Sequence, residues 1–141
     1  MTGVELLDKW YQHVWVEGDL DAVQRYFDTE ALAGGLLPDL AVQIQDFQTI
    51  VPAVLRLVTK VQYEIVESME VDDCAWALVR LSALNREDLK PVSITGQIMI
   101  RHKNGKIVHA QNHFDYVGFF EQLGNLPRDT MALCIAGEVL S

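Results

Sequence analysis

Cysteine is scarce in this chain of 141 residues, and so are the residue patterns that hold metals or cofactors. The two cysteines, Cys74 and Cys134, are far apart and match neither a disulfide framework nor the spacing of zinc ligands. We therefore expect two buried, reduced thiols. The sequence shows no phosphate-binding glycine loop, Ser-His-Asp arrangement or iron-binding triad, so no metal, nucleotide or other cofactor is predicted.

Positive charge is also scarce, with 11 lysines and arginines against 20 aspartates and glutamates and a formal net charge of -9. Only Arg101, Lys103 and Lys106 lie near one another, in an apparent hairpin where solvated charges are usual. A chain of this charge repels phosphate backbones and anionic lipids, so neither nucleic acid nor a membrane is expected as a partner. No secretory-type start and no apolar run of about 18 to 20 residues is present. These absences predict a soluble cytoplasmic protein.

Apolar residues make up 50% of the chain, and no polar low-complexity segment or linker interrupts them. A chain of this length and composition can bury one core, so we expect a single domain over residues 1–141.

Helical periodicity dominates the first part of the chain. Thr2 and Glu5 have the spacing of a capping box, and apolar residues recur at helical intervals up to Gly18. Asp19 is placed to cap a short second helix that ends near residue 27, and a third helix is expected from residue 46. Pro52 predicts a kink or a later start for that third helix. Residues 33–39, with two glycines and a proline, are predicted to form a loop.

From residue 60 onward the spacing changes to that of strands. Four strands are predicted, over residues 60–71, 74–84, 91–102 and up to 114, with tight turns at 72–73 and at the Asn-Gly pair 104–105. Asp115 then has the position of an N-cap before a helix that Gly124 ends. A last helix is expected over 129–139. Helices followed by an antiparallel meander predict an α+β fold.

Three segments carry a resemblance to a known family: WVEGDLDAVQRYFDTEA, ITGQIMI and RHKNGKIVHAQNHFDYVGFFEQLG. They resemble the SnoaL-like group of nuclear transport factor 2-like proteins, which includes polyketide cyclases and relatives of limonene epoxide hydrolase. The likeness covers residues 1–124 and leaves 125–141 as a helical extension. It implies a cone-shaped fold in which a curved, mostly antiparallel sheet and three N-terminal helices enclose a pocket.

Strand parity predicts which side chains face that pocket. Ile94, Gly96, Ile98 and Ile100 share one face of their strand, and Ala110, Asn112 and Phe114 share one face of the next, opposite to His109, Gln111 and His113. One face is therefore apolar and the other mixed. We expect an apolar cavity containing one polar amide, with the histidine-bearing face outward or in a dimer interface. The predicted ligand-binding residues are Tyr63, Ile98, Ile100, Asn112 and Phe114.

The resemblance also implies where catalytic residues would stand. The family's acid-base aspartate on the last strand matches Asn112, whose amide cannot exchange a proton near neutral pH. The family's glutamine and histidine on the preceding strand match Gly96 and Ile98. The usual cyclase mechanism is therefore not expected, unless the strand register differs by one residue and turns His113 and Asp115 inward. Asp115 is otherwise an N-cap.

Three hypotheses follow. The first is a pocket protein that binds a small apolar or aromatic molecule, with Asn112 orienting a ligand oxygen. The second is an isomerase, cyclase or epoxide hydrolase, with Asn112, His113 and Asp115 as the candidate catalytic residues. The third is an interaction module that forms a homodimer through the mixed face of the sheet, with Trp76, Leu78, Met99 and Gln111. A homodimer is compatible with either role of the pocket.

Overall fold

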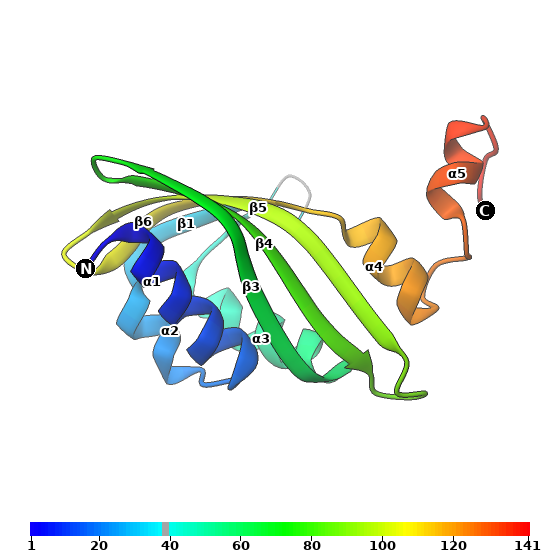
Figure 1. Ribbon diagram of the computed structural model, residues 1–141, viewed down its shortest axis with the longest axis horizontal. Helices are drawn as coiled ribbons and strands as arrows, with labels where there is room; N and C mark the ends of the chain where they lie inside the picture. Colours follow the sequence, from blue (N-terminus) through cyan, green and yellow to red (C-terminus); the bar gives the residue numbers. More distant parts are fainter. Residues whose placement is uncertain (38–39) are drawn as a thin grey trace.

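The computed structural model describes residues 1–37 and 40–141 and shows the expected α+β fold (Figure 1). The chain begins with helices and then alternates between helices and strands. The helical elements are α1 (Gly3–Trp10), the π-helix η1 (Tyr11–Val16), α2 (Asp21–Tyr26), the 3-10 helix η2 (Ile44–Asp46), α3 (Phe47–Leu55), α4 (Tyr116–Leu123) and α5 (Thr130–Ile135).

In the described part of the chain, six strands form one curved sheet in the order β2-β1-β6-β5-β4-β3. The strands are β1 (Phe27–Leu37), β2 (Leu40–Val42), β3 (Val58–Val71), β4 (Cys74–Asn85), β5 (Pro91–Lys103) and β6 (Lys106–Phe114). Among the described strand pairs only β1–β6 is parallel, so the sheet is mostly antiparallel as expected. Figure 1 shows the sheet arching over α1, α2 and α3, while α5 stands apart at the far end of the molecule.

The first helix begins at the predicted capping box. The Glu5 N–H donates to Thr2 Oγ1 over 3.1 Å, and the Thr2 N–H donates to Glu5 Oε2 over 3.3 Å. These bonds satisfy backbone donors that the first turn of a helix leaves free. The helix then widens into η1, whose backbone bonds reach five residues along, as from the Glu17 N–H to the Gln12 oxygen.

The prediction of a loop over residues 33–39 was wrong, because β1 extends to Leu37; residues 38–39 lie outside the described part. The two glycines that suggested a loop serve the strand instead. Gly35 has a φ of +80°, and a Cβ there would clash with the Asn112 carbonyl oxygen. Glycine therefore permits β1 to lie close against β6, and a bulge or irregularity in the β1 register accompanies this approach.

The predicted helix ends differ in detail from those observed. The cap residue of α2 is Leu20, not Asp19, although Asp19 Oδ1 accepts a bond from the Asp21 N–H. Helix α3 contains Pro52 and follows the short η2 turn directly. The last helix is shorter than expected, since it ends at Ile135.

Asp115 caps α4 as predicted, because its Oδ1 accepts a 3.0 Å bond from the Gly118 N–H. Helix α4 ends at Leu123, directly before Gly124. The β5–β6 turn falls at Asn104 and Gly105, which both have positive φ.

The expectation of two buried thiols was wrong for Cys134, which is exposed on α5, and Cys74 is only partly buried. The isolated position of α5 gives Cys134 little to pack against.

The core lies between the first helices and the inner face of the sheet. Three aromatic rings meet there: the centroids of Trp10 and Phe47 are 5.1 Å apart, and those of Phe27 and Phe47 are 5.2 Å apart, both pairs edge to face. Such pairs are stabilising beyond the burial of their area. The same three rings also form part of the wall of a cavity between the helices and the sheet.

Candidate functional site

A cavity of about 400 Å³ lies between the inner face of the sheet and the helices. Its volume is in the lower part of the range of small-molecule sites. Among the residues that the structure describes, no aspartate, glutamate, lysine, arginine or histidine side chain lines its wall. Aromatic rings form much of it, from Trp10, Tyr11, Trp15, Phe27, Phe47, Phe114, Tyr116, Phe119 and Phe120. A cavity with a wall of this composition favours an uncharged, apolar ligand.

The sheet side of the cavity has the predicted strand register. Ile98 pairs with Asn112 across β5 and β6, and Gly96 pairs with Phe114. Ile98, Asn112 and Phe114 all line the cavity. The ring of Phe114 lies against Gly96, where any side chain would displace it. The absence of a side chain at position 96 therefore allows the Phe114 ring to cover this part of the wall.

Asn112 is the buried amide of this wall, with 5% of its surface exposed. Its Nδ2 donates a 3.3 Å bond to the Gly34 carbonyl oxygen on β1. That bond fixes the amide plane and leaves Oδ1 as a hydrogen-bond acceptor at the cavity wall.

Two of the residues predicted to bind a ligand lie outside the cavity wall. Ile100 is fully buried in the core. The Tyr63 hydroxyl lies 3.1 Å from both the backbone oxygen and Oδ1 of Asp8, and burial together with this contact raises the Tyr63 pKa. Parity predicted that Ile100 shares a face with Ile98, but it cannot tell how deep along the cavity a residue lies. The packing of α1 against the sheet decides that.

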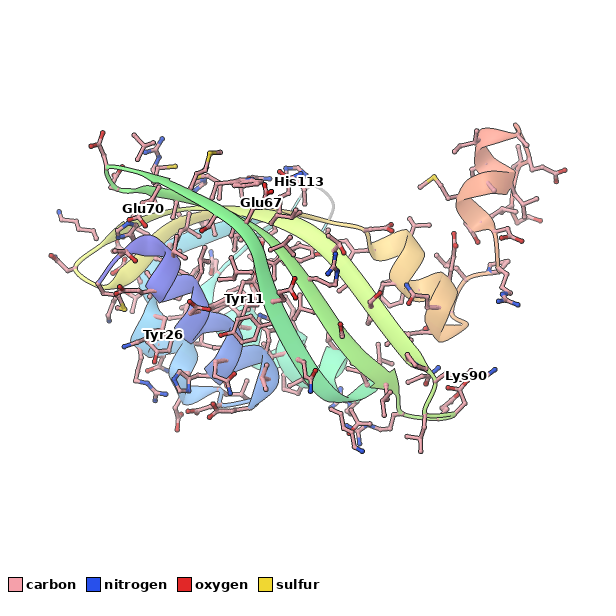
Figure 2. All side chains as sticks on the ribbon, in the orientation of Figure 1. Tyr11, Tyr26, Glu67, Glu70, Lys90 and His113 are labelled. Atoms are coloured by element: carbon pink, nitrogen blue, oxygen red, sulfur yellow. The ribbon has the colours of Figure 1, made fainter. Side chains whose placement is uncertain are left out.

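His113 and Asp115 also lie outside the cavity wall. His113 is exposed on the outer face, and Figure 2 shows it on the side of the sheet away from the helices. Asp115 is exposed and caps α4. The one-residue slip that would turn them inward does not occur, because Gln97 pairs with His113 and Ile98 with Asn112.

Two tyrosines that sequence reasoning did not select contribute hydroxyl groups to the wall. Tyr11, at the start of η1, is 3% exposed, and Tyr116, at the start of α4, is partly buried. Burial raises the pKa of Tyr116 to about 12. Burial, together with repulsion from an ionised Tyr116, raises the pKa of Tyr11 well above its ordinary value. Both phenols are therefore neutral hydrogen-bond donors at pH 7.

The sequence signals for these tyrosines were ambiguous. Tyr11 belongs to the apolar stripe of the first helix, where an aromatic residue usually only packs. Tyr116 follows the N-cap Asp115 and shows no periodicity that sets it apart. Only the fold brings the two phenols to one cavity.

The described part of the chain contains neither a candidate metal-binding cluster nor a helix that could span a membrane. Within residues 1–37 and 40–141, no three His, Cys, Asp or Glu side chains gather in a way that could hold a metal ion. None of the helices in that part of the chain has the length and apolar character needed to cross a membrane.

No protein-family model matches the sequence, and no curated protein matches it. Solved structures do resemble the fold. The candidate hydroxylase AclR from Streptomyces galilaeus superposes with a TM-score of 0.75 at 17% identity, covering 94% of this chain and 87% of AclR. A candidate polyketide cyclase from Bacillus cereus gives a TM-score of 0.76 at 16% identity, covering 86% of this chain and 79% of its own.

A protein of ketosteroid isomerase-like fold from Catenulispora acidiphila, solved with trimethylamine, gives a TM-score of 0.74 at 14% identity, covering 92% of this chain and 98% of that one. Similarity at these identities establishes the fold alone. The chain therefore has the ketosteroid isomerase-like, nuclear transport factor 2-like fold that SnoaL-like polyketide cyclases share, as the sequence resemblance implied.

Proposed function

We propose that this protein binds a small, uncharged and mainly apolar molecule in the cavity. The observation that carries the proposal is the composition of the wall, whose described residues are almost entirely apolar and include no charged side chain. An apolar cavity offers water few hydrogen-bond partners, so water is held there weakly. Apolar ligands bind in such cavities readily. The polar side chains of Asn112, Ser82, Tyr11 and Tyr116 lie in the wall and can orient the ligand.

The test is direct binding of a neutral fluorescent probe, N-phenylnaphthylamine, followed by probe emission and by titration calorimetry. We expect binding of one probe per chain. Ala83→Trp places a large ring at the cavity wall and should weaken binding at least about tenfold by excluded volume. Ala132→Trp, on exposed α5, is the matched control and should bind normally. Equal binding by both variants, or none by the unaltered protein, would contradict the proposal.

Catalysis is the second candidate function, because a cyclase or hydroxylase activity appears in the names of similar structures. Acid-base catalysis needs a group that exchanges protons near neutral pH. Within residues 1–37 and 40–141, the titratable groups of the wall are Tyr11 and Tyr116, and both hold their protons at pH 7. The wall therefore favours binding over proton abstraction. Turnover of a small carbonyl compound or epoxide that persists in Tyr11→Phe/Tyr116→Phe would point to a base elsewhere.

We also propose that two copies of the chain associate through the outer face of the sheet. Trp76, Leu78 and Met99 lie together on this face, partly buried, and Trp76 Nε1 donates a 3.0 Å bond to Gln97. Arg80 is half-exposed at 3.5 Å from Glu64, so both signs of charge flank the apolar centre. Because a two-fold axis brings the same patch of both copies together, a patch that carries both positive and negative charge can pair opposite charges across the interface. Sedimentation should show a dimer that Leu78→Asp converts to a monomer.

A further inference from the structure

The last helix, α5, presents a stripe of apolar side chains to solvent. Met131, Cys134 and Ile135 are exposed and stand at positions i, i+3 and i+4, so they share one side of the helix. Ile135 alone is 80% exposed. A helix of six residues is too short to be stable in water by itself, and packing of this stripe against another surface would stabilise it.

A second exposed apolar group lies on the outer face of the sheet, near the turn between β3 and β4. Met69 and Val71 are 65% and 70% exposed. Met69 pairs with Trp76, and Trp76 pairs with Met99, so these three side chains stand on one face. Met69 and Val71 therefore extend the outer-face patch of Trp76, Leu78 and Met99 toward this end of the molecule. Exposed apolar groups that join into a patch are typical of interaction sites.

The two apolar groups lie at opposite ends of the chain. Figure 1 shows α5 at one end and the β3–β4 turn at the other, both on the side of the sheet away from α1, α2 and α3. The two groups of one chain are therefore too far apart to meet. Two copies that face each other through the outer face can bring them together. A two-fold axis that crosses the long axis of the molecule reverses the second copy end to end, so each α5 meets the partner's β3–β4 turn.

Charge favours this reversed arrangement over the alternative. A two-fold axis along the length of the molecule would set α5 against α5. The segment 125–141 carries Asp129 and Glu138 against the single Arg128, so it would face its own net negative charge. At the other end, Lys103 and Lys106 of the β5–β6 hairpin would also face their own copies. Like charges placed opposite each other across an interface are unfavourable.

The end of the sheet that would receive α5 carries no excess of negative charge. The β5–β6 turn lies at the same end as the β3–β4 turn, because β4 begins opposite the end of β5. The two hairpin ends hold three acidic and three basic residues: Glu70, Asp72, Asp73, Arg101, Lys103 and Lys106. In a chain with a net charge of -9, this end repels an acidic segment less than the rest of the surface does.

We infer that α5 of each chain packs its stripe of Met131, Cys134 and Ile135 against Met69 and Val71 of a second copy. The inference rests on the proposed association through the outer face of the sheet. It adds the contact that sets the orientation of the two copies, and it gives the exposed stripe of α5 a function.

The native thiol of Cys134 allows a covalent test with the full-length chain. Cys74→Ser removes the other thiol, and Met69→Cys adds one beside the β3–β4 turn. In a glutathione redox buffer this double variant should form a disulfide-linked dimer, which non-reducing electrophoresis separates and peptide mass spectrometry assigns to positions 69 and 134. Thr49→Cys, exposed on α3 on the opposite side of the sheet, is the matched control and should give no such dimer.

Sedimentation equilibrium measures the same contact without thiol chemistry. Ile135→Asp and Met69→Asp should each weaken the dimer at least about tenfold, because each buries a charge in an apolar contact. Ala132→Asp adds the same charge to another side of α5 and should change the dimer Kd by less than about twofold. All three side chains are exposed in the single chain, and thermal unfolding checks that the fold of each variant persists.

The outcomes distinguish this inference from the proposed association. A 69–134 link between chains, with a dimer weakened by Ile135→Asp and Met69→Asp but not by Ala132→Asp, supports the inference. A dimer that dissociates in Leu78→Asp but tolerates both of those changes, and forms no 69–134 link, overturns the inference while the association stands.

Other results also have a definite meaning. A link between two copies of position 134 would place α5 against α5, and a 69–134 link within one chain would fold α5 onto its own sheet; either result overturns the inference. A 69–134 link in a dimer that Leu78→Asp leaves intact keeps the α5 contact and overturns the association through the centre of the outer face. A chain that stays monomeric at every concentration overturns both.

Discussion

The side chain of Asn112 donates a 3.3 Å hydrogen bond to the Gly34 carbonyl oxygen, which joins β6 to β1 directly beside the cavity. This bond spans 78 residues of sequence and crosses the single parallel strand pair of the described sheet. The amide thus has a structural role as well as a place on the cavity wall. Replacing it tests how apolar the surroundings of position 112 are.

Asn112→Asp should lower the free energy of unfolding at pH 7, because burial raises the pKa of a carboxyl in an apolar cavity. Each unit by which the folded-state pKa exceeds the unfolded value costs about 1.4 kcal/mol. The cost should be absent below the unfolded pKa of about 4, grow as the pH rises toward the folded pKa, and then stay constant. Urea unfolding between pH 3 and pH 8, at intervals of about one unit, measures this dependence. Asn112→Leu, which removes the bond without adding charge, should show a pH-independent loss, and identical profiles for the two variants would contradict an apolar site.

Gly35→Ala should destabilise the protein strongly. Two effects add there: a φ of +80°, which costs about 1 to 2 kcal/mol for a residue with a Cβ, and a clash with the Asn112 carbonyl oxygen. Gly137→Ala is the matched control, because Gly137 has a φ of +88° and open space around it. Chemical denaturation measures the loss in free energy of unfolding for both variants, and the difference between the two losses is the cost of the clash. Equal losses would show that β1 and β6 do not approach as closely as described.

Substitutions of Asp115 distinguish a helix-capping role of its side chain from a catalytic role. Asp115→Ala should cost about 0.5 to 2 kcal/mol of stability, whereas Asp115→Asn should cost little, because asparagine caps helices as well as aspartate does. Neither change should alter ligand binding in the cavity. Thermal unfolding and probe titration check both expectations. A large effect of Asp115→Asn on binding or turnover, with stability unchanged, would return Asp115 to the site.

Glu70 should make the fold sensitive to acid. Its carboxylate accepts bonds from the Gly3 N–H at 2.9 Å and the Val4 N–H at 3.2 Å and lies 3.1 Å from His102 Nε2, beside the start of α1 (Figure 2). The bond from Gly3 is the largest cause that lowers the Glu70 pKa, followed by the bonds from Val4 and His102. Because the folded pKa is depressed, the stabilisation is present above the unfolded pKa and is lost as the pH falls through the folded value.

Glu70→Gln removes that charge and should flatten the acid limb of the stability profile, measured by denaturation from pH 7 down to about pH 3. Glu67→Gln, on the same strand and exposed, provides the control and should keep the acid limb. An unchanged acid limb in Glu70→Gln would show that other carboxylates dominate acid unfolding.

The sequence by itself determined the features that depend on near neighbours. The capping box of Thr2 and Glu5, the Asn104–Gly105 turn and the Asp115 cap are bonds or backbone angles within a few residues, so local patterns predicted them. Strand parity also predicted the inward side of Ile98, Asn112 and Phe114, because alternation along a strand holds whatever the strand packs against. The incorrect prediction of a loop over residues 33–39 shows the limit of such local patterns, because only the contact with β6 explains why glycine stands in a strand there.

Tertiary structure alone decided which inward residues reach the cavity. Ile100 shares the predicted face with Ile98, yet it is buried in the core outside the cavity wall, and the phenols of Tyr11 and Tyr116 take part in the wall instead. Those two residues are 105 positions apart in sequence, so no periodicity relates them. Both line one cavity because of the curvature of the sheet and the helices it carries at its two ends, and these depend on contacts distant in the chain.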